Sequence, residues 1–172
     1  MKNAGDVIFR WAGPEDYAAV LALNEVFVDV LSPLDLAALT KLHSEAAYFR
    51  VVEVRGKVAA FLIAMKPQAS YGSDNYQWFE SRYDDFIYID RIVVAAEARG
   101  MALGPQLYND LGVFAAGVGL KKLVCEYNIQ PMNEVSMKFH QRYGFAEVGQ
   151  LGSDNNSKRV SMQSYELPVS GV

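Results

Sequence analysis

The chain has 172 residues, of which 51% are hydrophobic and 21% are charged, and its formal net charge is −4 at pH 7. This length and composition are typical of one soluble globular domain, over residues 1–172, with a sizeable core. The negative net charge and the lack of a basic patch argue against nucleic acid as the main partner. No apolar run approaches the ~18 residues that span a membrane.

Cysteine and histidine are rare in the chain. Cys125 is the one cysteine and lies in an apolar run, so we expect a small buried side chain, with a catalytic thiol as the alternative. A chain with one cysteine and no signal-peptide core in Met1–Asp6 is typical of a reducing compartment, so we predict a cytoplasmic protein. His43 and His140 are too few and too far apart for a metal cluster, and we expect no metal.

The first third of the chain predicts a strand, two helices and a β-hairpin. Gly13-Pro14-Glu15-Asp16 is typical of a helix start, with proline early and acids in the first turn. In that helix Asn24 lies among apolar residues, as a satisfied buried amide or as a substrate contact. Arg55-Gly56-Lys57 is a hairpin signal. The expected elements are a strand at 7–11, a helix from 13, a helix at 36–45, and strands at 48–54 and 58–65.

A long segment, Pro67–Asp85, follows the hairpin and is rich in aromatic residues. Connectors of this length in compact domains are often functional. We therefore consider three roles for its aromatic side chains: the wall of a substrate pocket, a contact in a homodimer, or packing over the edge of a sheet.

The centre of the chain reads as a strand, a loop of small residues and a helix. Phe86–Val94 is a nearly continuous apolar run, which favours a strand buried on both faces. Arg99–Gly104 then leads into an amphipathic helix that reaches Val118. The first N–H groups of a helix lack partners within it and lie at the positive end of its dipole, so small residues there favour a phosphate site. An ordinary tight turn is the alternative.

The last third predicts a strand, a helix and an antiparallel pair of strands. The strand 122–128 follows a strand and a helix, which implies a parallel pair with a right-handed crossover. In the expected helix 132–143, Asn133, Ser136 and His140 share one arc. The final pair is expected at 147–151 and 159–167.

Two motifs of the chain resemble signatures of the GCN5-related N-acetyltransferases. Arg99-x-x-Ala102-x-Gly104 is similar to their pyrophosphate loop, Arg/Gln-x-x-Gly-x-Gly/Ala, with Ala102 in place of the first glycine. The second motif, at the expected distance, runs Asn133-x-x-Ser136-x-x-Phe139-His140-x-x-x-Gly144-Phe145. Together the motifs cover roughly the C-terminal half of the chain.

The resemblance implies a fold and a cofactor. The fold is a single α/β (α+β) domain whose mixed, mostly antiparallel sheet has about six or seven strands, with one splayed parallel pair and about four flanking helices. The cofactor is acetyl-CoA, with its pantetheine arm in the gap between the splayed strands. The implied cofactor contacts are Ile92, Val93, Val94, Arg99, Gly100, Met101, Ala102, Leu103, Gly104, Pro105, Asn133, Ser136 and His140.

Three residues are candidates for catalysis. His140 stands where many family members carry a tyrosine that protonates the leaving thiolate; it acts as the acid or only orients the cofactor. Asp90 and Glu126 are candidate bases, because carboxylates in apolar strands are unusual unless they are paired or functional. We expect Arg91 to be unable to share the face of Asp90, since strand neighbours point to opposite sides. The alternative for Asp90 is a structural ion pair or hydrogen bond, and that for Asn133 is a helix cap.

The resemblance therefore implies an acetyl-CoA-dependent N-acetyltransferase acting on the amine of a small molecule, a peptide or a protein. Transfer would occur by direct attack within a ternary complex. The alternative is an acyl-CoA-binding sensor or interaction domain of the same fold that has lost catalysis, which the departures at Ala102 and His140 keep open.

Overall fold

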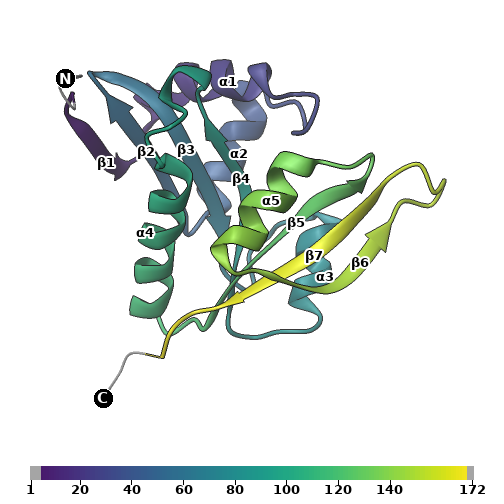
Figure 1. The fold of residues 1–172 in the computed structure, drawn as a ribbon. Helices are drawn as coiled ribbons and strands as arrows, with labels where there is room; N and C mark the ends of the chain where they lie inside the picture. Colours follow the sequence, from purple (N-terminus) through teal and green to yellow (C-terminus); the bar gives the residue numbers. More distant parts are fainter. Residues whose placement is uncertain (1–4, 170–172) are drawn as a thin grey trace. The chain divides into compact units, whose positions relative to one another are not determined.

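The computed structural model describes residues 5–169, which contain seven strands and five α-helices (Figure 1). The strands are β1 Val7–Trp11, β2 Tyr48–Val54, β3 Lys57–Met65, β4 Phe86–Val94, β5 Lys122–Gln130, β6 Ala146–Gly152 and β7 Arg159–Glu166. The helices are α1 Tyr17–Val26, α2 Leu36–Glu45, α3 Asp74–Glu80, α4 Leu103–Gly117 and α5 Glu134–Tyr143. Short 3-10 turns lie at Pro14–Asp16 and Ala96–Ala98.

The strands form one mixed sheet in the order β1-β2-β3-β4-β5-β7-β6. The pairs β1–β2, β2–β3, β5–β7 and β6–β7 are antiparallel, whereas β4 and β5 run parallel, with Phe86 opposite Lys122 and Tyr88 opposite Val124. A parallel pair needs a crossover connection, which α4 supplies. The predicted mixed, mostly antiparallel sheet with one parallel pair is confirmed, and the splaying of that pair stays a prediction.

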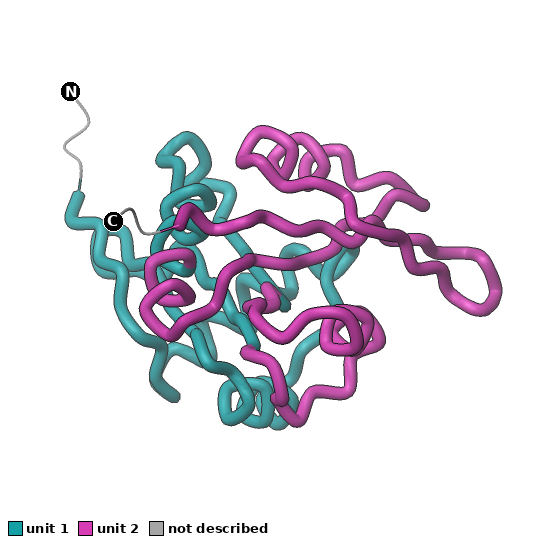
Figure 2. Tube along the Cα trace, turned by 90° about the horizontal axis from the view of Figure 1, so that it is seen from below, with its two compact units in different colours: residues 1–65, 90–111 teal, residues 66–89, 112–172 magenta. Residues whose placement is uncertain are grey.

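The chain divides into two compact units, drawn in different colours in Figure 2. Unit 1 comprises residues 1–65 and 90–111, and unit 2 comprises residues 66–89 and 112–172. The chain therefore passes from one unit to the other at the end of β3, within β4 and again within α4. The single domain expected over residues 1–172 stays a prediction. No helix among residues 5–169 is long and apolar enough to cross a membrane.

The core of unit 1 lies around β2 and β3, which are buried on both faces. Tyr48 and Phe49 are neighbours on β2 and point to opposite sides, as strand neighbours do. The Tyr48 hydroxyl donates to Asp110 of α4 at 2.6 Å, while the Phe49 ring lies 4.8 Å from the ring of His43 on α2. Helices on both faces explain why the sequence of β3 reads as an unbroken apolar run.

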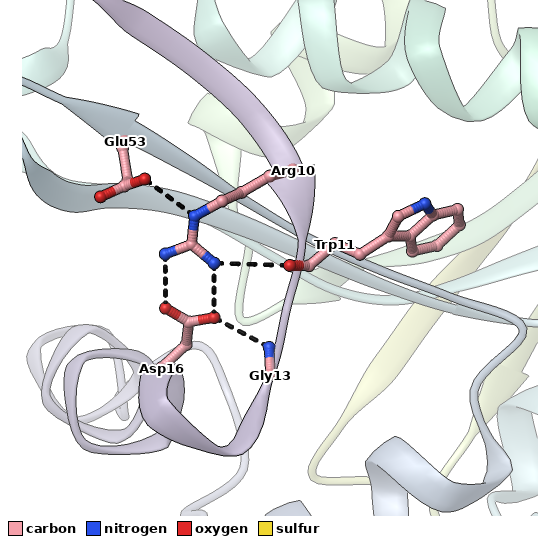
Figure 3. Close-up of polar contacts among 5 residues, drawn as sticks. All are labelled: Arg10, Trp11, Gly13, Asp16 and Glu53. Atoms are coloured by element: carbon pink, nitrogen blue, oxygen red, sulfur yellow. Dashed lines mark hydrogen bonds and ion pairs between the residues drawn. The ribbon is translucent and has the colours of Figure 1, made fainter.

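A cluster of charges joins β1, the turn before α1, and β2 (Figure 3). The Arg10 guanidinium donates to both carboxylate oxygens of Asp16, at 2.7 and 2.8 Å, and its Nε donates to Glu53 at 2.8 Å. The Gly13 N–H also donates to Asp16 at 2.8 Å. The bond from Arg10, more than that from Gly13, lowers the pKa of the buried Asp16 carboxyl below its ordinary value.

We expect Asp16→Asn to lower the free energy of unfolding at pH 7 by about 2 kcal/mol, because it leaves Arg10 without its bidentate partner. A lowered folded-state pKa adds stability above the unfolded pKa, and that stability disappears as the pH falls through the folded value. Urea titrations at pH 7 and at an acid pH below the ordinary carboxyl value of about 3.9 should therefore show that the difference between the two proteins narrows as the pH falls. Glu15→Gln is the control, since the described residues give the Glu15 carboxylate no hydrogen-bond partner. If the free energies of unfolding of the two proteins differed equally at both pH values, this role for Asp16 would be contradicted.

Helix α3 lies within the segment predicted as a connector, and it raises the number of α-helices from about four to five. The Ser73 hydroxyl caps the helix by accepting from the Tyr76 N–H. Tyr76 and Phe79 are buried, with their rings against Phe86 and Tyr88 of β4. These two aromatic side chains of the segment are thus core residues of unit 2. The sequence did contain a signal for helix α3, in the Ser73 cap and in the i, i+3 spacing of Tyr76 and Phe79.

Two other helices begin later than the sequence indicates. The Pro14–Asp16 turn is 3-10, so α1 starts at Tyr17 rather than at Gly13. Met132 forms a β-bridge with Ile129, so α5 starts at Glu134. The expected second helix and the final antiparallel pair are confirmed.

Candidate functional site

The loop before α4 presents a row of backbone N–H groups. Within residues 5–169, the N–H groups of Gly100, Ala102, Leu103 and Gly104 have no hydrogen-bond partner. Gly100 has φ +87°, and a side-chain carbon placed on it would meet no atom within 4 Å. The positive end of the α4 dipole lies at the same place. This open, electropositive backbone suits a phosphate or pyrophosphate.

Ala102 adopts the left-handed conformation, with φ +56°. Glycine reaches this region without a steric penalty, whereas an alanine there costs of order 1 kcal/mol. The loop is held by Gln106, whose N–H donates to the Ala102 carbonyl at 3.2 Å and whose side-chain amide donates to the Met101 carbonyl at 2.9 Å. Ala102 thus adopts a backbone conformation that favours glycine, the residue found at this position in the family pattern.

Asp90 and Arg91 of β4 form an ion pair, although the sequence predicts that the two side chains leave the strand on opposite faces. The Arg91 Nε donates to the Asp90 carboxylate at 3.2 Å, and Nη1 donates to Asn24 Oδ1 at 3.0 Å and to the Ser32 carbonyl at 2.6 Å. The long arginine side chain bends back around the strand, which the alternation of Cβ atoms does not prevent. Asn24 is fully buried and donates to the same carbonyl at 3.1 Å, so it is a satisfied amide.

Further along β4, the three residues expected beside the acyl arm lie in unit 1 with the loop. Val93 is buried, and Ile92 and Val94 are half-buried. The N–H of the next residue, Ala95, donates to the Ala59 carbonyl at 2.8 Å. Their side chains thus belong to the packing of unit 1, as expected of residues that offer only backbone groups.

Glu126 of β5 lies in unit 2, and two neutral donors hold one of its carboxylate oxygens. The Tyr88 hydroxyl of β4 and the Asn75 side-chain amide of α3 each donate to Oε1 at 2.9 Å. Figure 1 shows α3 on one face of β5 and β7, and α5 on the other. The Glu126 side chain therefore points to the α3 face of the sheet.

Helix α5 carries the second predicted motif. Asn133 is its N-cap, since Oδ1 accepts from the Ser136 N–H at 3.1 Å, which is the structural alternative considered for this residue. Gly144 ends the helix in the left-handed conformation, with φ +116°. The motif thus specifies both ends of the helix, whatever it contributes to binding.

His140 is buried between aromatic rings on the inner face of α5. Its ring stacks on Tyr127 and meets Phe139 and Phe145 edge-on. Nδ1 lies 2.7 Å from the Ser136 carbonyl oxygen, which only accepts, so Nδ1 carries a proton and donates it. Burial lowers the pKa of His140 below its ordinary value, although the bond to Ser136 opposes the shift. The imidazole is therefore neutral at pH 7, with its proton on Nδ1.

Unit 2 also contains an open hollow of about 490 Å³ between α3 and the turn of the β6–β7 hairpin. Its lining residues are Asp74, Gln77, Trp78, Leu151, Gly152, Ser153 and Asp154. The Trp78 ring lies against the backbone of Gly149, where a Cβ atom would come within 2.4 Å of the ring, and the Arg82 guanidinium covers the ring at 3.8 Å. Gly149 thus provides the space for one wall of the hollow.

The structure divides the predicted residues into two groups, one in each compact unit. Arg99–Pro105 and Ile92–Val94 belong to unit 1, where Asp90 pairs with Arg91. Asn133, Ser136 and His140 share α5 in unit 2, and Glu126 lies in the same unit. Sequence reasoning missed Asn75 and Tyr88, the two donors to Glu126. Cys125 is buried in β5. Among residues 5–169, no group of three or more histidine, cysteine or acidic side chains is arranged to hold a metal.

Comparison with solved structures shows the same fold in proteins from other organisms. Ard1 from Thermoplasma volcanium has a TM-score of 0.76 and 17% identity, with 95% of this chain and 99% of that chain covered. The yncA protein from Salmonella typhimurium, solved with its cofactor acetyl-CoA, has a TM-score of 0.69 and 17% identity, covering 98% of both chains. Arabidopsis thaliana Naa50, in complex with the bisubstrate analogue CoA-Ac-MVNAL, has a TM-score of 0.68 and 14% identity, covering 92% and 97%.

A search of curated proteins by sequence found no match. The family model described as the acetyltransferase (GNAT) family matches residues 15–145, which is well over half of the chain and includes the loop before α4 and the whole of α5. On this match, supported by the shared fold, the chain belongs to the GNAT acetyltransferase family.

Proposed function

We propose that the protein is an acetyl-CoA-dependent N-acetyltransferase that passes the acetyl group directly to an amine in a ternary complex. The amine nitrogen attacks the thioester carbonyl, the new C–N bond forms as the C–S bond breaks, the amine gives up a proton and the CoA thiolate gains one. The observation that carries the proposal is the set of N–H groups of Gly100, Ala102, Leu103 and Gly104, which have no hydrogen-bond partner within residues 5–169 and suit the CoA pyrophosphate.

The cofactor residues follow from this placement. Arg99–Pro105 would hold the pyrophosphate, and the backbone of Ile92–Val94 would pair with the acyl-pantetheine arm. Asn133 uses its Oδ1 to cap α5, so only its side-chain N–H groups are available to donate to the cofactor. Ser136 lies one turn before His140 and would support the imidazole rather than reach the thioester.

Glu126 is the base that the contacts favour. Asp90 is tied to the Arg91 guanidinium, which in turn holds the carbonyl of Ser32, so it serves the packing of unit 1. The two donors described for Glu126 are neutral groups, and its carboxylate would take a proton from the amine, directly or through a water molecule.

The amine acceptor remains a class rather than a compound. The hollow beside α3 is lined in part by Asp74, Gln77 and Trp78, which belong to the segment considered above as a wall of the substrate pocket. Its two carboxylates, Asp74 and Asp154, have no ion-pair partner among the described residues. They suit a substrate that carries positive charge. The peptide part of the analogue bound to Naa50 supports a peptide amine as one acceptor class. A homodimer and a cytoplasmic location stay predictions.

Turnover separates the enzyme from the sensor. The purified protein is mixed with acetyl-CoA and a panel of small amines, amino acids and peptides, and release of the CoA thiol is followed with a thiol reagent. Amine-dependent thiol release supports the transferase. Acetyl-CoA binding without thiol release for any amine would favour the acyl-CoA sensor.

We expect His140→Phe to raise the acetyl-CoA Kd several-fold while kcat stays within about tenfold, because the Nδ1 proton is held by the backbone and the imidazole acts by position. A loss of ~10² in kcat with an unchanged Kd would instead show that His140 is the acid.

His140→Phe also tests whether burial of the imidazole makes the stability of the protein depend on pH. A lowered pKa means that stability is lost as the pH falls below the unfolded value of about 6.5, and urea titrations of His140→Phe should lack that loss.

A further inference from the structure

We infer that Asn75, on helix α3, is a positioning residue that holds the Glu126 carboxylate for proton transfer. The inference rests on the proposed function of Glu126 as the base. Asn75 lies 51 positions before Glu126 in sequence, yet its side-chain N–H reaches Glu126 Oε1 at 2.9 Å. Neither residue belongs to the loop or to the α5 motif.

The backbone that carries Asn75 is fixed on both sides. The residue before it, Asp74, follows the Ser73 cap, and the residue after it is the buried Tyr76. The Tyr76 hydroxyl donates to the Lys66 carbonyl at 2.7 Å and accepts from the Ala69 N–H at 3.0 Å. Since these contacts hold α3 in place, the amide of Asn75 is presented at a defined position rather than from a mobile loop.

The second donor restricts the carboxylate further. Tyr88 is almost fully buried on β4, and its hydroxyl reaches the same oxygen of Glu126 at 2.9 Å. Two donors from different elements that converge on one oxygen fix the plane of a carboxylate and stabilise its charged form. Asn75 and Tyr88 therefore restrain the orientation in which the Glu126 carboxylate accepts a proton.

The test is the pH profile of kcat/KM for Asn75→Ala. Loss of the donor should make the charged form of Glu126 less favourable, so the acidic limb should move to higher pH by about half a unit. We expect kcat to fall roughly tenfold while the acetyl-CoA KM is unchanged, because the cofactor loop is not touched. Asn75→Asp keeps the shape but places a like charge beside Glu126, and it should move the limb further. Gln141→Ala, which removes an exposed amide on α5, is the control and should leave the profile unchanged.

Two further measurements decide the outcome. In a Glu126→Gln background, Asn75→Ala should have almost no additional effect, whereas an effect of full size there would overturn the inference. The protonation midpoint of Glu126 is also followed by carbon-13 NMR of its side-chain carboxyl, without substrate, and should rise in both Asn75 variants. A midpoint that does not move would overturn the positioning role even in an active enzyme. The midpoint could also shift in the Asn75 variants while Glu126→Gln loses no rate. That result would support the contact between Asn75 and Glu126 but would refute Glu126 as the base.

Discussion

Gly100→Glu is expected to raise the acetyl-CoA Kd at least tenfold, which corresponds to about 1.4 kcal/mol or more. The new carboxylate would stand on the loop that is proposed to bind the pyrophosphate, and its negative charge would repel the cofactor. Isothermal titration calorimetry with acetyl-CoA measures the change directly.

The control for this substitution lies at the other end of the same helix. Gly119 also has a positive φ, +82° compared with +87° for Gly100, and also has no atom within 4 Å of a Cβ placed on it. Gly119→Glu therefore introduces the same charge and a similar backbone strain away from the proposed site. If both variants bind acetyl-CoA equally, the loop before α4 is not the cofactor site.

Glu126→Gln is expected to lower kcat/KM by about 10² at pH 7, with the acetyl-CoA Kd nearly unchanged. Glutamine keeps the shape and removes the base, so the rate should recover at high pH, where the amine is already neutral. The pH dependence of kcat/KM, together with calorimetric binding, gives both quantities.

Asp90→Asn is the matched comparison for Glu126→Gln. It removes the charge that pairs with Arg91, so we expect a lower free energy of unfolding in a urea titration and a rate close to that of the unchanged protein. The opposite pattern, in which Asp90→Asn loses the rate and Glu126→Gln keeps it, would make Asp90 the base and Glu126 a structural residue.

Local patterns in the sequence were sufficient for most of the fold. The apolar run of β4, the small residues before α4 and the Gly144 stop of α5 are each signalled by neighbouring residues, and the parallel pair follows from the order strand, helix, strand. Ser136 and His140 could also be paired in advance, because positions four apart meet on a helix face.

Contacts between residues far apart in sequence could not be predicted in the same way. The aromatic content of residues 67–85 concealed the periodicity of α3, and without α3 there was no means to place Asn75 beside Glu126. Arg91 was misjudged because the alternation rule describes where Cβ points, whereas a guanidinium several bonds further out is free to fold back. The candidate site thus depends on side-chain reach, which a strand or helix pattern does not encode.

The place of β7 in the sheet has a consequence for how the nascent chain folds. β7 lies between β5 and β6, although it follows both in sequence. As the chain leaves the ribosome, β6 has no strand to pair with until Arg159–Glu166 has been synthesised, and β5 exposes an unpaired edge for the same period. A chain shortened before β7 would keep the loop before α4 and the helix α5 in its sequence but would expose strand edges that promote aggregation.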